Sequence, residues 1–522
     1  MKKLLIVIAF IALAVLAAPY LIPADALKSQ LIAKLEAATG KKIVIAGHFG
    51  ITLFPSVGVQ AEKVSILEPL PAGAADYKQI PLADIQSLKI DVALMPLLHK
   101  EIQLQSAKVA DANVEYNQLG ITHANFTIVP AANSSLAMDG DMTWKDKAVR
   151  LKSQLEAPQD CLQTKHCHFS NVALKLGNID AKGDIKLNVA GTVPVIEIML
   201  STPALDLTEF LPPQKQAARG WLIGNALADS SGWSKEPIDL SFLRRFNAKV
   251  NIDADSVRVY DVKLGKTTLK AELIDKILTV NMPDFECYGG KGLISAVVDV
   301  RGAEPRLERG ATLKGIDLGA FLKDAVGYDR FSGKADINSA AGTRGNSMHD
   351  FISALQGTGS VKVRDGAIKG YNIADMVRNV QSAFKDVDTS ARQTDFSELS
   401  GTFTINNGIV ANNDLSMLAP LFRLTGAGTV NLPEQTLQYR LTPQFIDTLK
   451  GQDSGKQGGI GVPVIVEGSL DHPTFRPDVR AVVEDVMKNP DAYKEKAKEA
   501  KEAIKGLKDI FKKKKPAPTP AP

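Results

Sequence analysis

The stretch FRLTGAGTVNLPEQTLQYRL, residues 422–441, alternates small or apolar residues with polar ones along most of its length. A period of two is typical of a β-strand with one apolar face and one solvated face. The break at Pro433-Glu434-Gln435 predicts a hairpin loop between two such strands. An apolar sheet face must be covered by something, so its cover decides what this chain can fold into.

The same alternation recurs in FNAKVNIDAD (246–255), GLISAVVDVRG (292–302) and GDIKLNVAG (183–191). Asn407-Gly408 and Asp365-Gly366 are hairpin signals, because both residue types tolerate positive φ. These patterns predict a mainly β fold: a long curved antiparallel sheet, shaped as a groove or a sandwich, with few short helices.

Helical spacing is found in only a few places. Apolar spacing and end signals predict short helices at residues 317–327 and 373–384, with a further candidate at 347–357. Such helices can plug one end of a sheet but cannot cover its length. Aromatic residues make up 6% of the chain, which is low for a chain that must fill large packed cores.

The N-terminus carries Lys2 and Lys3, followed by an apolar run over residues 4–22. A secretory signal peptide cut after Ala17 and an uncleaved transmembrane helix both fit this pattern. We favour the transmembrane anchor, because Pro19 disfavours cleavage there and the run is long enough to span a bilayer. In both cases the lysines stay in the cytoplasm and the rest of the chain is exported, which in a bacterium means to the periplasm.

Changes in composition divide the chain into five predicted segments. Pro212-Pro213 and the loss of periodicity around them mark a linker between two β regions, and beyond Arg476 the strand pattern stops. The segments are 1–23 (transmembrane anchor), 24–210 (N-terminal β region), 211–237 (linker), 238–476 (C-terminal β region) and 477–522 (lysine-rich helical tail with a Pro/Ala-rich end).

The net charge of the whole chain is uninformative, but the C-terminal tail is strongly basic. With 62 basic and 58 acidic residues the net charge is +4, so we expect no nucleic-acid partner. The tail between Lys494 and Lys515 carries ten lysines against four acids. It fits either a solvated helix or a contact with an anionic surface such as lipid head groups. The residues expected to make that contact are Lys512, Lys513, Lys514 and Lys515.

The sequence contains no complete catalytic or cofactor-binding motif. LGKTT (264–268) ends like a phosphate-binding loop, but Tyr260 occupies the position of its first glycine. Acidic residues such as Asp253 and Asp255 fall on the wet faces of predicted strands. We therefore expect no enzyme activity, no cofactor and no metal.

Three cysteines exclude a disulfide scaffold. Cys161 and Cys167 lie six residues apart with His166 and His168 beside them, so a metal site, free thiols and a local disulfide are all open. We favour the Cys161–Cys167 disulfide, because the spacing fits no standard zinc pattern and the compartment is expected to be oxidising. Cys287 would then remain single, as a small buried apolar residue.

Several longer stretches resemble the AsmA family. They include WSKEPIDLSFLRRFNAKVNIDADSVRVYDVKL, LQGTGSVKVRDGAIKGYNIADMVRNV and the closing VPVIVEGSLDHPTFRPDV, with the strongest likeness over residues 233–479. The resemblance implies an inner-membrane-anchored periplasmic protein of outer-membrane biogenesis. Larger relatives look like bridge-like lipid carriers, and older descriptions speak of assembly or membrane targeting of outer-membrane proteins. It implies no catalytic residues.

Our leading hypothesis is that phospholipid acyl chains cover part of the apolar face while head groups stay outside. The rival is a β scaffold that binds no lipid and regulates outer-membrane protein assembly, with its apolar faces packed as dry core. Expected partners are membrane lipids, the inner membrane through residues 4–22, and outer-membrane or envelope proteins. The candidate groove residues are Phe246, Val250, Ile252, Ile294, Val298, Val300, Leu424, Val430, Leu432, Leu437 and Leu441.

Overall fold

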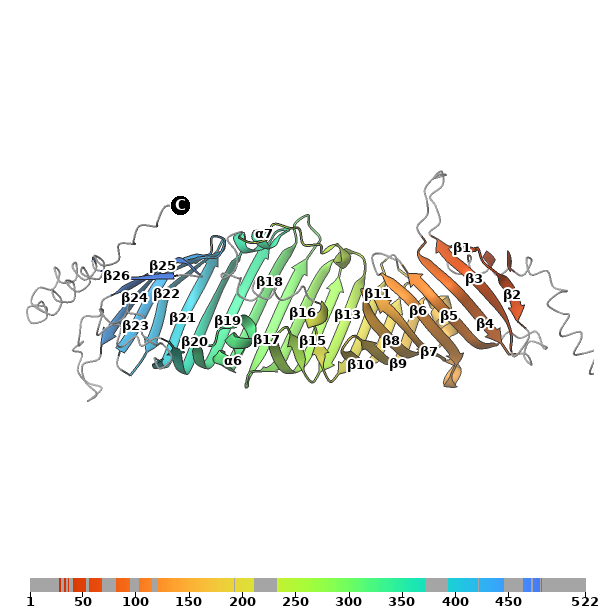
Figure 1. The fold of residues 1–522 in the computed structure, drawn as a ribbon, viewed down its shortest axis with the longest axis horizontal. Helices are drawn as coiled ribbons and strands as arrows, with labels where there is room; N and C mark the ends of the chain where they lie inside the picture. Colours follow the sequence, from red (N-terminus) through yellow and green to blue (C-terminus); the bar gives the residue numbers. More distant parts are fainter. Residues whose placement is uncertain are drawn as a thin grey trace, which may run out of the picture. The chain divides into compact units, whose positions relative to one another are not determined.

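A computed structural model gives the fold (Figure 1). Apart from a few residues between 28 and 36 and residue 480, it describes residues 41–52, 56–67, 81–93, 103–114, 120–191, 193–210, 232–370, 393–420, 422–445, 463–470 and 473–478. The chain forms two compact units. The first takes Met1–Ala204 with Ala248–Ile252, and the second takes Leu205–Asn247 with Asp253–Pro522.

The first unit is built on an antiparallel sheet. On one side β3 (Val57–Leu67) pairs with β1 (Lys42–Ile45) and β2 (Phe49–Thr52), and from β3 to β11 each strand pairs with the next. Residues 248–252 of β13 (Asn247–Ala254) then pair with β11. The other elements are β4 (Ala83–Val92), β5 (Leu104–Val114), β6 (Ile121–Pro130), η1 (Ala132–Ser134), β7 (Leu136–Trp144), β8 (Lys147–Glu156), α4 (Pro158–Thr164), β9 (His166–Leu176), β10 (Ile179–Asn188) and β11 (Val195–Thr202).

The second unit repeats this design, and successive strands again lie side by side (Figure 1). Its first elements are β12 (Leu205–Asp206), η2 (Thr208–Phe210), η3 (Ser241–Arg244), β14 (Val257–Val259), β15 (Val262–Ile274), β16 (Ile277–Cys287), β17 (Gly290–Asp299) and β18 (Arg306–Asp317). There follow α6 (Leu318–Val326), β19 (Phe331–Arg344), α7 (Met348–Ser353), β20 (Gln356–Lys369), β21 (Gln393–Asn406), β22 (Ile409–Leu418), β23 (Phe422–Asn431), β24 (Thr436–Phe445), β25 (Val464–Ser469) and β26 (Pro473–Pro477).

The mainly β prediction is confirmed, with two corrections. The pairing is mixed, because β12 runs parallel to β14. Asp365-Gly366 does not turn a hairpin but lies inside β20, where Asp365 takes a φ of 49° next to a register shift in the pairing with β19. A residue pair that tolerates positive φ serves a β-bulge as well as a turn, so the sequence signal alone was ambiguous.

The predicted turn at Asn407-Gly408 and the loop at 433–435 do connect β21 to β22 and β23 to β24. The helix predicted at 317–327 is α6. Asp317 caps it by accepting a hydrogen bond from the Ala320 amide at 3.0 Å, and Gly327 ends it with a φ of 70°. A capping box at Ser347 and Asp350 starts α7, and the helix predicted at 373–384 lies outside the described residues.

The main buried core belongs to the second unit and sits where α6 lies against β18 and β19 (Figure 1). Ile316 and Ala335 are completely buried there, and Leu318, Phe321 and Leu322 bring the apolar side of α6 onto them. A smaller cluster in the first unit joins β1 to β3 through Ile43, Ile45, Ala61 and Val64. The helix α6, which we call the plug, therefore covers part of one sheet face.

Candidate functional site

One face of the second unit's sheet is apolar from β16 to β24. Residues directly opposite each other in an antiparallel pair share a face. Following the pairs in this way places the following residues together, which we call the apolar face: Leu278, Val280, Met282, Ile294, Ala296, Val298, Leu307, Arg309, Ala311, Leu313, Ile337, Ser339, Ala341, Val361, Leu399, Phe403, Ile405, Val410, Asn412, Leu415, Leu424, Val430, Leu437, Tyr439 and Leu441.

The opposite face of the same strands is polar. Lys362 pairs with Glu398 at 2.7 Å and Arg364 with Asp336 at 2.9 Å across neighbouring strands. On β23, Arg423, Thr425 and Thr429 are exposed on this face. The two faces thus differ in chemistry along the strands, as the alternation in the sequence predicted.

Six of the predicted groove residues lie on the apolar face. Leu424 is 5% exposed and belongs to the buried core, so it is closed to any ligand. The others are half-buried, which leaves part of each side chain accessible. The six residues are Ile294, Val298, Leu424, Val430, Leu437 and Leu441.

The remaining predicted residues are placed elsewhere. Val250 and Ile252 belong to the first unit, and Phe246 precedes β13. Val300 follows the end of β17 and is 1% exposed. Its amide donates to Lys276 O at 3.0 Å, in the turn between β15 and β16.

Leu432 lies in the turn after β23, because Pro433 cannot continue the ladder. Alternation alone had extended both this strand and β17 by one residue too many.

Aromatic side chains on these sheets lie opposite glycines. A Cβ added at Gly292 would overlap Cζ of Phe285, and one at Gly359 would overlap Cζ of Phe403. The ring therefore occupies the space that the missing side chain leaves on the neighbouring strand. The paired residues are Phe126 with Gly140, Phe285 with Gly292, Phe396 with Gly366, Phe403 with Gly359, and Tyr439 with Gly428. The rings thus keep close to the sheet rather than standing up from it.

The described residues place no second layer over the middle of the apolar face. Among the described elements, β21 to β24 make extensive contacts only with neighbouring strands, whereas α6 contacts β15, β18 and β19. The face is therefore dry core beside α6 and half-open elsewhere. Exposed apolar surfaces of this kind commonly mark binding sites, so we take this face as the candidate functional site.

One polar pair interrupts the apolar face at β22 and β24. The Tyr439 hydroxyl donates a hydrogen bond to Asn412 Oδ1. Burial raises the pKa of Tyr439 to about 12, and the nearby Asp414 carboxylate adds to the shift. The phenol therefore stays neutral at physiological pH, and the pair needs no counter-ion.

Residues 232–244, which span the end of the predicted linker and the start of the predicted C-terminal β region, run along the hairpin ends of the second unit. Trp233 Nε1 donates to Leu432 O at 2.8 Å, Ser234 O accepts from the His349 amide at 2.9 Å, and Arg244 Nη2 donates to Gly302 O at 2.9 Å. These partners follow β23, β19 and β17, whose C-terminal ends lie at the same edge. Residues 232–244, which we call the strap, thus tie that edge together, and periodicity gave no sign of it.

The first unit also has an apolar face, shown by pairs such as Val59 with Ile90, Val109 with Phe126, and Ile185 with Ile198.

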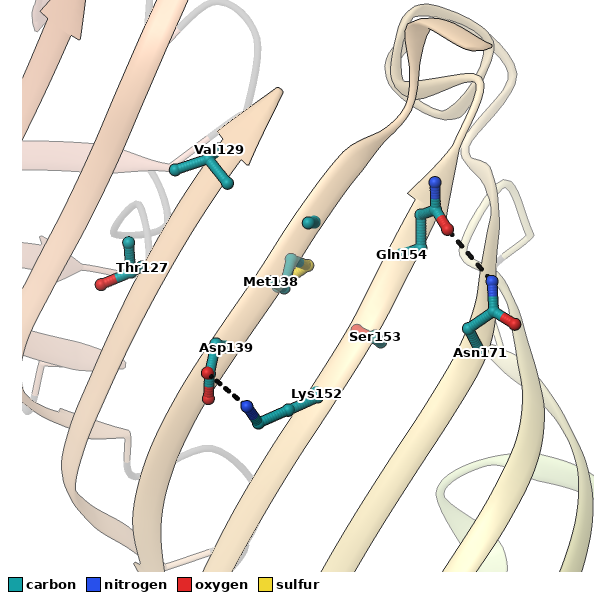
Figure 2. Close-up of a pocket in the computed structure, with 9 residues that line it drawn as sticks. Thr127, Val129, Met138, Asp139, Lys152, Ser153, Gln154 and Asn171 are labelled. Carbon is teal, nitrogen blue, oxygen red and sulfur yellow. Dashed lines mark hydrogen bonds and ion pairs between the residues drawn. The ribbon is translucent and has the colours of Figure 1, made fainter. Parts of the chain in front are cut away.

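A depression of about 320 Å³ in the first unit is lined by residues of β6 to β9 (Figure 2). Lys152 pairs with Asp139 in it at 2.9 Å and holds the pKa of that carboxyl below its usual value. Asn171 donates to Gln154 Oε1 at 3.0 Å (Figure 2). These polar groups satisfy each other across neighbouring strands.

Cys161 and Cys167 are joined by a disulfide, with Cα atoms 4.6 Å apart, that links α4 to the start of β9. Cys287 is a free thiol, 5% exposed, in the main core, and burial raises its pKa. Within the described part of the chain, no group of three metal-ligating side chains comes together.

Two sequence predictions concern segments at the ends of the chain. The apolar run at 4–22 and Lys512 to Lys515 lie outside the described residues. Among the helices that are described, none is long and apolar enough to cross a membrane.

Comparison with known proteins agrees with the sequence resemblance. Protein AsmA of Escherichia coli strain K12 is 21% identical over 301 residues, which cover 55% of this chain and 48% of that protein. The match therefore spans about half the length of this relative. No solved structure gives a significant match. A sequence model of the AsmA family matches residues 1–152 and 117–415, more than half of the chain. The chain belongs to the AsmA family.

Proposed function

We propose that this protein is anchored in the inner membrane, acts in outer-membrane biogenesis, and carries phospholipid along the apolar face of its sheet. The observation that carries the proposal is the half-open apolar face of β16 to β24, bordered by a polar face that keeps the sheet soluble. Membership of the AsmA family supports the link to the outer membrane.

The driving force for binding is the hydrophobic effect. Each CH₂ group kept out of water stabilises the complex by about 0.8 kcal/mol, so an acyl chain on this face gains several kcal/mol. Rings that keep close to the sheet, such as Phe403 over Gly359, leave room for a chain above them. Movement along the face is passive in this proposal, and its direction comes from a concentration gradient or from partners.

The expected location follows from the ends of the chain. Residues 4–22 anchor the protein in the inner membrane, with Lys2 and Lys3 in the cytoplasm and the sheets in the periplasm. The lysine-rich tail adds a contact with anionic surfaces. The proposal assigns no catalytic step to the protein, and its partners are lipids and envelope proteins.

The rival proposal is a scaffold for outer-membrane protein assembly that binds no lipid. The dry core beside α6 favours it locally, because Ile316 and Ala335 are completely covered by protein. In this proposal a partner protein covers the rest of the apolar face. The two proposals therefore differ in what touches the half-open residues.

Photo-crosslinking at adjacent residues separates them. Val430 lies on the apolar face and is half-buried, whereas Thr429 is exposed on the polar face. We replace each residue in the full chain with benzoylphenylalanine, irradiate cells, and analyse the adducts by mass spectrometry. We expect phospholipid adducts at Val430 and none at Thr429. Protein adducts at Val430 without lipid would establish the scaffold instead.

A charge on the apolar face gives a second test. Val298→Asp and Val430→Asp should abolish the lipid adducts formed at a crosslinker on Leu437, while Thr429→Asp should leave them unchanged. Unaltered lipid capture in both valine variants would contradict the proposed path.

A further inference from the structure

Arg309 stands on the apolar face rather than on the polar one. In the register of β17, β18 and β19 it is opposite Ala296 on one side and Ala341 on the other. The flanking positions on its own strand, Leu307 and Ala311, are apolar. Among the described paired positions of this face from β16 to β24, Arg309 alone carries a formal charge.

The guanidinium of Arg309 is hydrogen-bonded to a hydroxyl group and has no carboxylate partner among the described residues. Arg309 Nη1 donates to Ser339 Oγ at 3.2 Å, diagonally across to β19. No carboxylate of the described residues lies within ion-pair distance of it. On the polar face, by contrast, Arg364 pairs with Asp336 at 2.9 Å. Small neighbours and an exposed side chain leave the remaining donors of Arg309 accessible.

This arrangement restricts what can cover the face. A purely apolar cover would bury an arginine without a counter-charge, which is strongly unfavourable. A cover that brings an anion would instead make charge-assisted, bidentate hydrogen bonds to the guanidinium. The occupant that fits is therefore an amphiphile with apolar chains and one negatively charged oxygen group.

We propose that Arg309, helped by Ser339, binds the phosphate of an anionic phospholipid and so selects lipids by head-group charge. This inference rests on the proposed function. The acyl chains lie over neighbours such as Val298 and Leu307, and the phosphodiester meets the guanidinium. Zwitterionic lipids bring their own ammonium group, which competes for the same phosphate, and so bind less well.

The test measures selectivity separately from capture. The full chain, with benzoylphenylalanine at Val298, is reconstituted in vesicles of equal parts phosphatidylglycerol and phosphatidylethanolamine, and the two kinds of adduct are quantified by mass spectrometry. The variant is Arg309→Gln. The matched control is Arg306→Gln, which removes a charge from the polar face of the same strand. Arg309→Lys keeps the charge without the planar fork.

We expect phosphatidylglycerol adducts to exceed phosphatidylethanolamine adducts in the wild type and in Arg306→Gln. In Arg309→Gln the ratio should fall about tenfold, which corresponds to about 1.4 kcal/mol. Arg309→Lys, as a folded variant, should retain part of the preference. If Arg309→Gln still captures lipid with an unchanged ratio, the role of Arg309 is overturned but the proposed function is not. Absence of any lipid adduct in the wild type would overturn the proposed function and this inference together.

Discussion

At the scale of single residues, the pairing of glycine with an aromatic ring explains how so few aromatics serve such long sheets. Phe285 lies over Gly292 and Phe403 over Gly359, so each ring covers the backbone of the next strand. The sequence shows glycines and aromatics in strand patterns, but it does not show which of them are opposite each other. That knowledge requires the register, which side-chain alternation leaves open.

Replacing Gly359 with valine should therefore damage β20 locally. The new Cβ would overlap the Phe403 ring and lie 2.7 Å from Asn338 O, which is backbone and cannot move away freely. We expect a loss of about 1–3 kcal/mol. The control is Gly342→Val, where the nearest atoms lie 3.7 Å away. Hydrogen exchange of β20 amides measures the effect, and equal protection in both variants would contradict it.

Two half-buried tyrosines predict a loss of stability in alkali. Burial raises the pKa of Tyr288 and of Tyr439 to about 12, and Tyr288 also donates to Asp324 Oδ2 at 3.0 Å. The folded state therefore holds both protons between pH 10 and 12, where the unfolded chain releases them. The free energy of unfolding is unaffected below pH 10 and falls as pH rises through that window.

The double variant Tyr288→Phe, Tyr439→Phe should lose this part of the fall between pH 10 and 12. Denaturant unfolding followed over that range compares the two proteins, and near-ultraviolet absorbance reports the phenolate directly. Identical pH profiles would show that the two phenols ionise normally in the folded state.

At the scale of elements, the sequence predicted a helix or turn correctly where the residues that determine it lie within one short segment. The end signals at Asp317 and Gly327 located α6 within one residue. The strap at residues 232–244 escaped prediction, because its hydrogen bonds join residues far apart in sequence, such as Trp233 and Leu432. The same reason explains Asp365, whose role as a bulge depends on the partner strand.

Where the plug α6 packs on β18 and β19, the apolar face becomes a true core. Ile316→Ala should cost about 2–5 kcal/mol, because Ile316 is completely buried among Phe285, Ala335 and Leu318. Leu293→Ala is the control, since Leu293 is 44% exposed on the other face of β17 and should cost below about 0.5 kcal/mol. Thermal unfolding of the full chain compares the two, and a similar small shift in both would show that the plug is not tightly packed.

At the scale of the whole molecule, the sequence carried the class of the fold and the presence of two chemically different faces. It did not carry the placement of Val250 and Val430 in separate units, because alternation describes each strand alone. It also missed Arg309, since one charge in an apolar alternation is read as part of the polar face until the register is known.

The lysine-rich end gives a prediction for the whole chain. Replacing Lys512, Lys513, Lys514 and Lys515 with glutamine should weaken binding to vesicles rich in phosphatidylglycerol, by up to about 1 kcal/mol for each lysine at low salt. Co-sedimentation at increasing salt measures it, because screening removes the same attraction. The control variant replaces Lys494, Lys496, Lys498 and Lys501 instead. If both variants bind the vesicles equally, the total charge of the tail matters and Lys512 to Lys515 have no special role.

The neighbour-to-neighbour pairing within each unit also bears on how such a chain changes length over evolution. From β3 to β11, and again from β14 to β26, each strand pairs with the strand synthesised just before it. Inserting or deleting one whole hairpin leaves every other strand with its direction and its inward face unchanged. A loss of one strand alone would reverse the direction of everything after it. Relatives are therefore expected to differ in length by whole hairpins, and a longer sheet can arise by duplication without rebuilding a core.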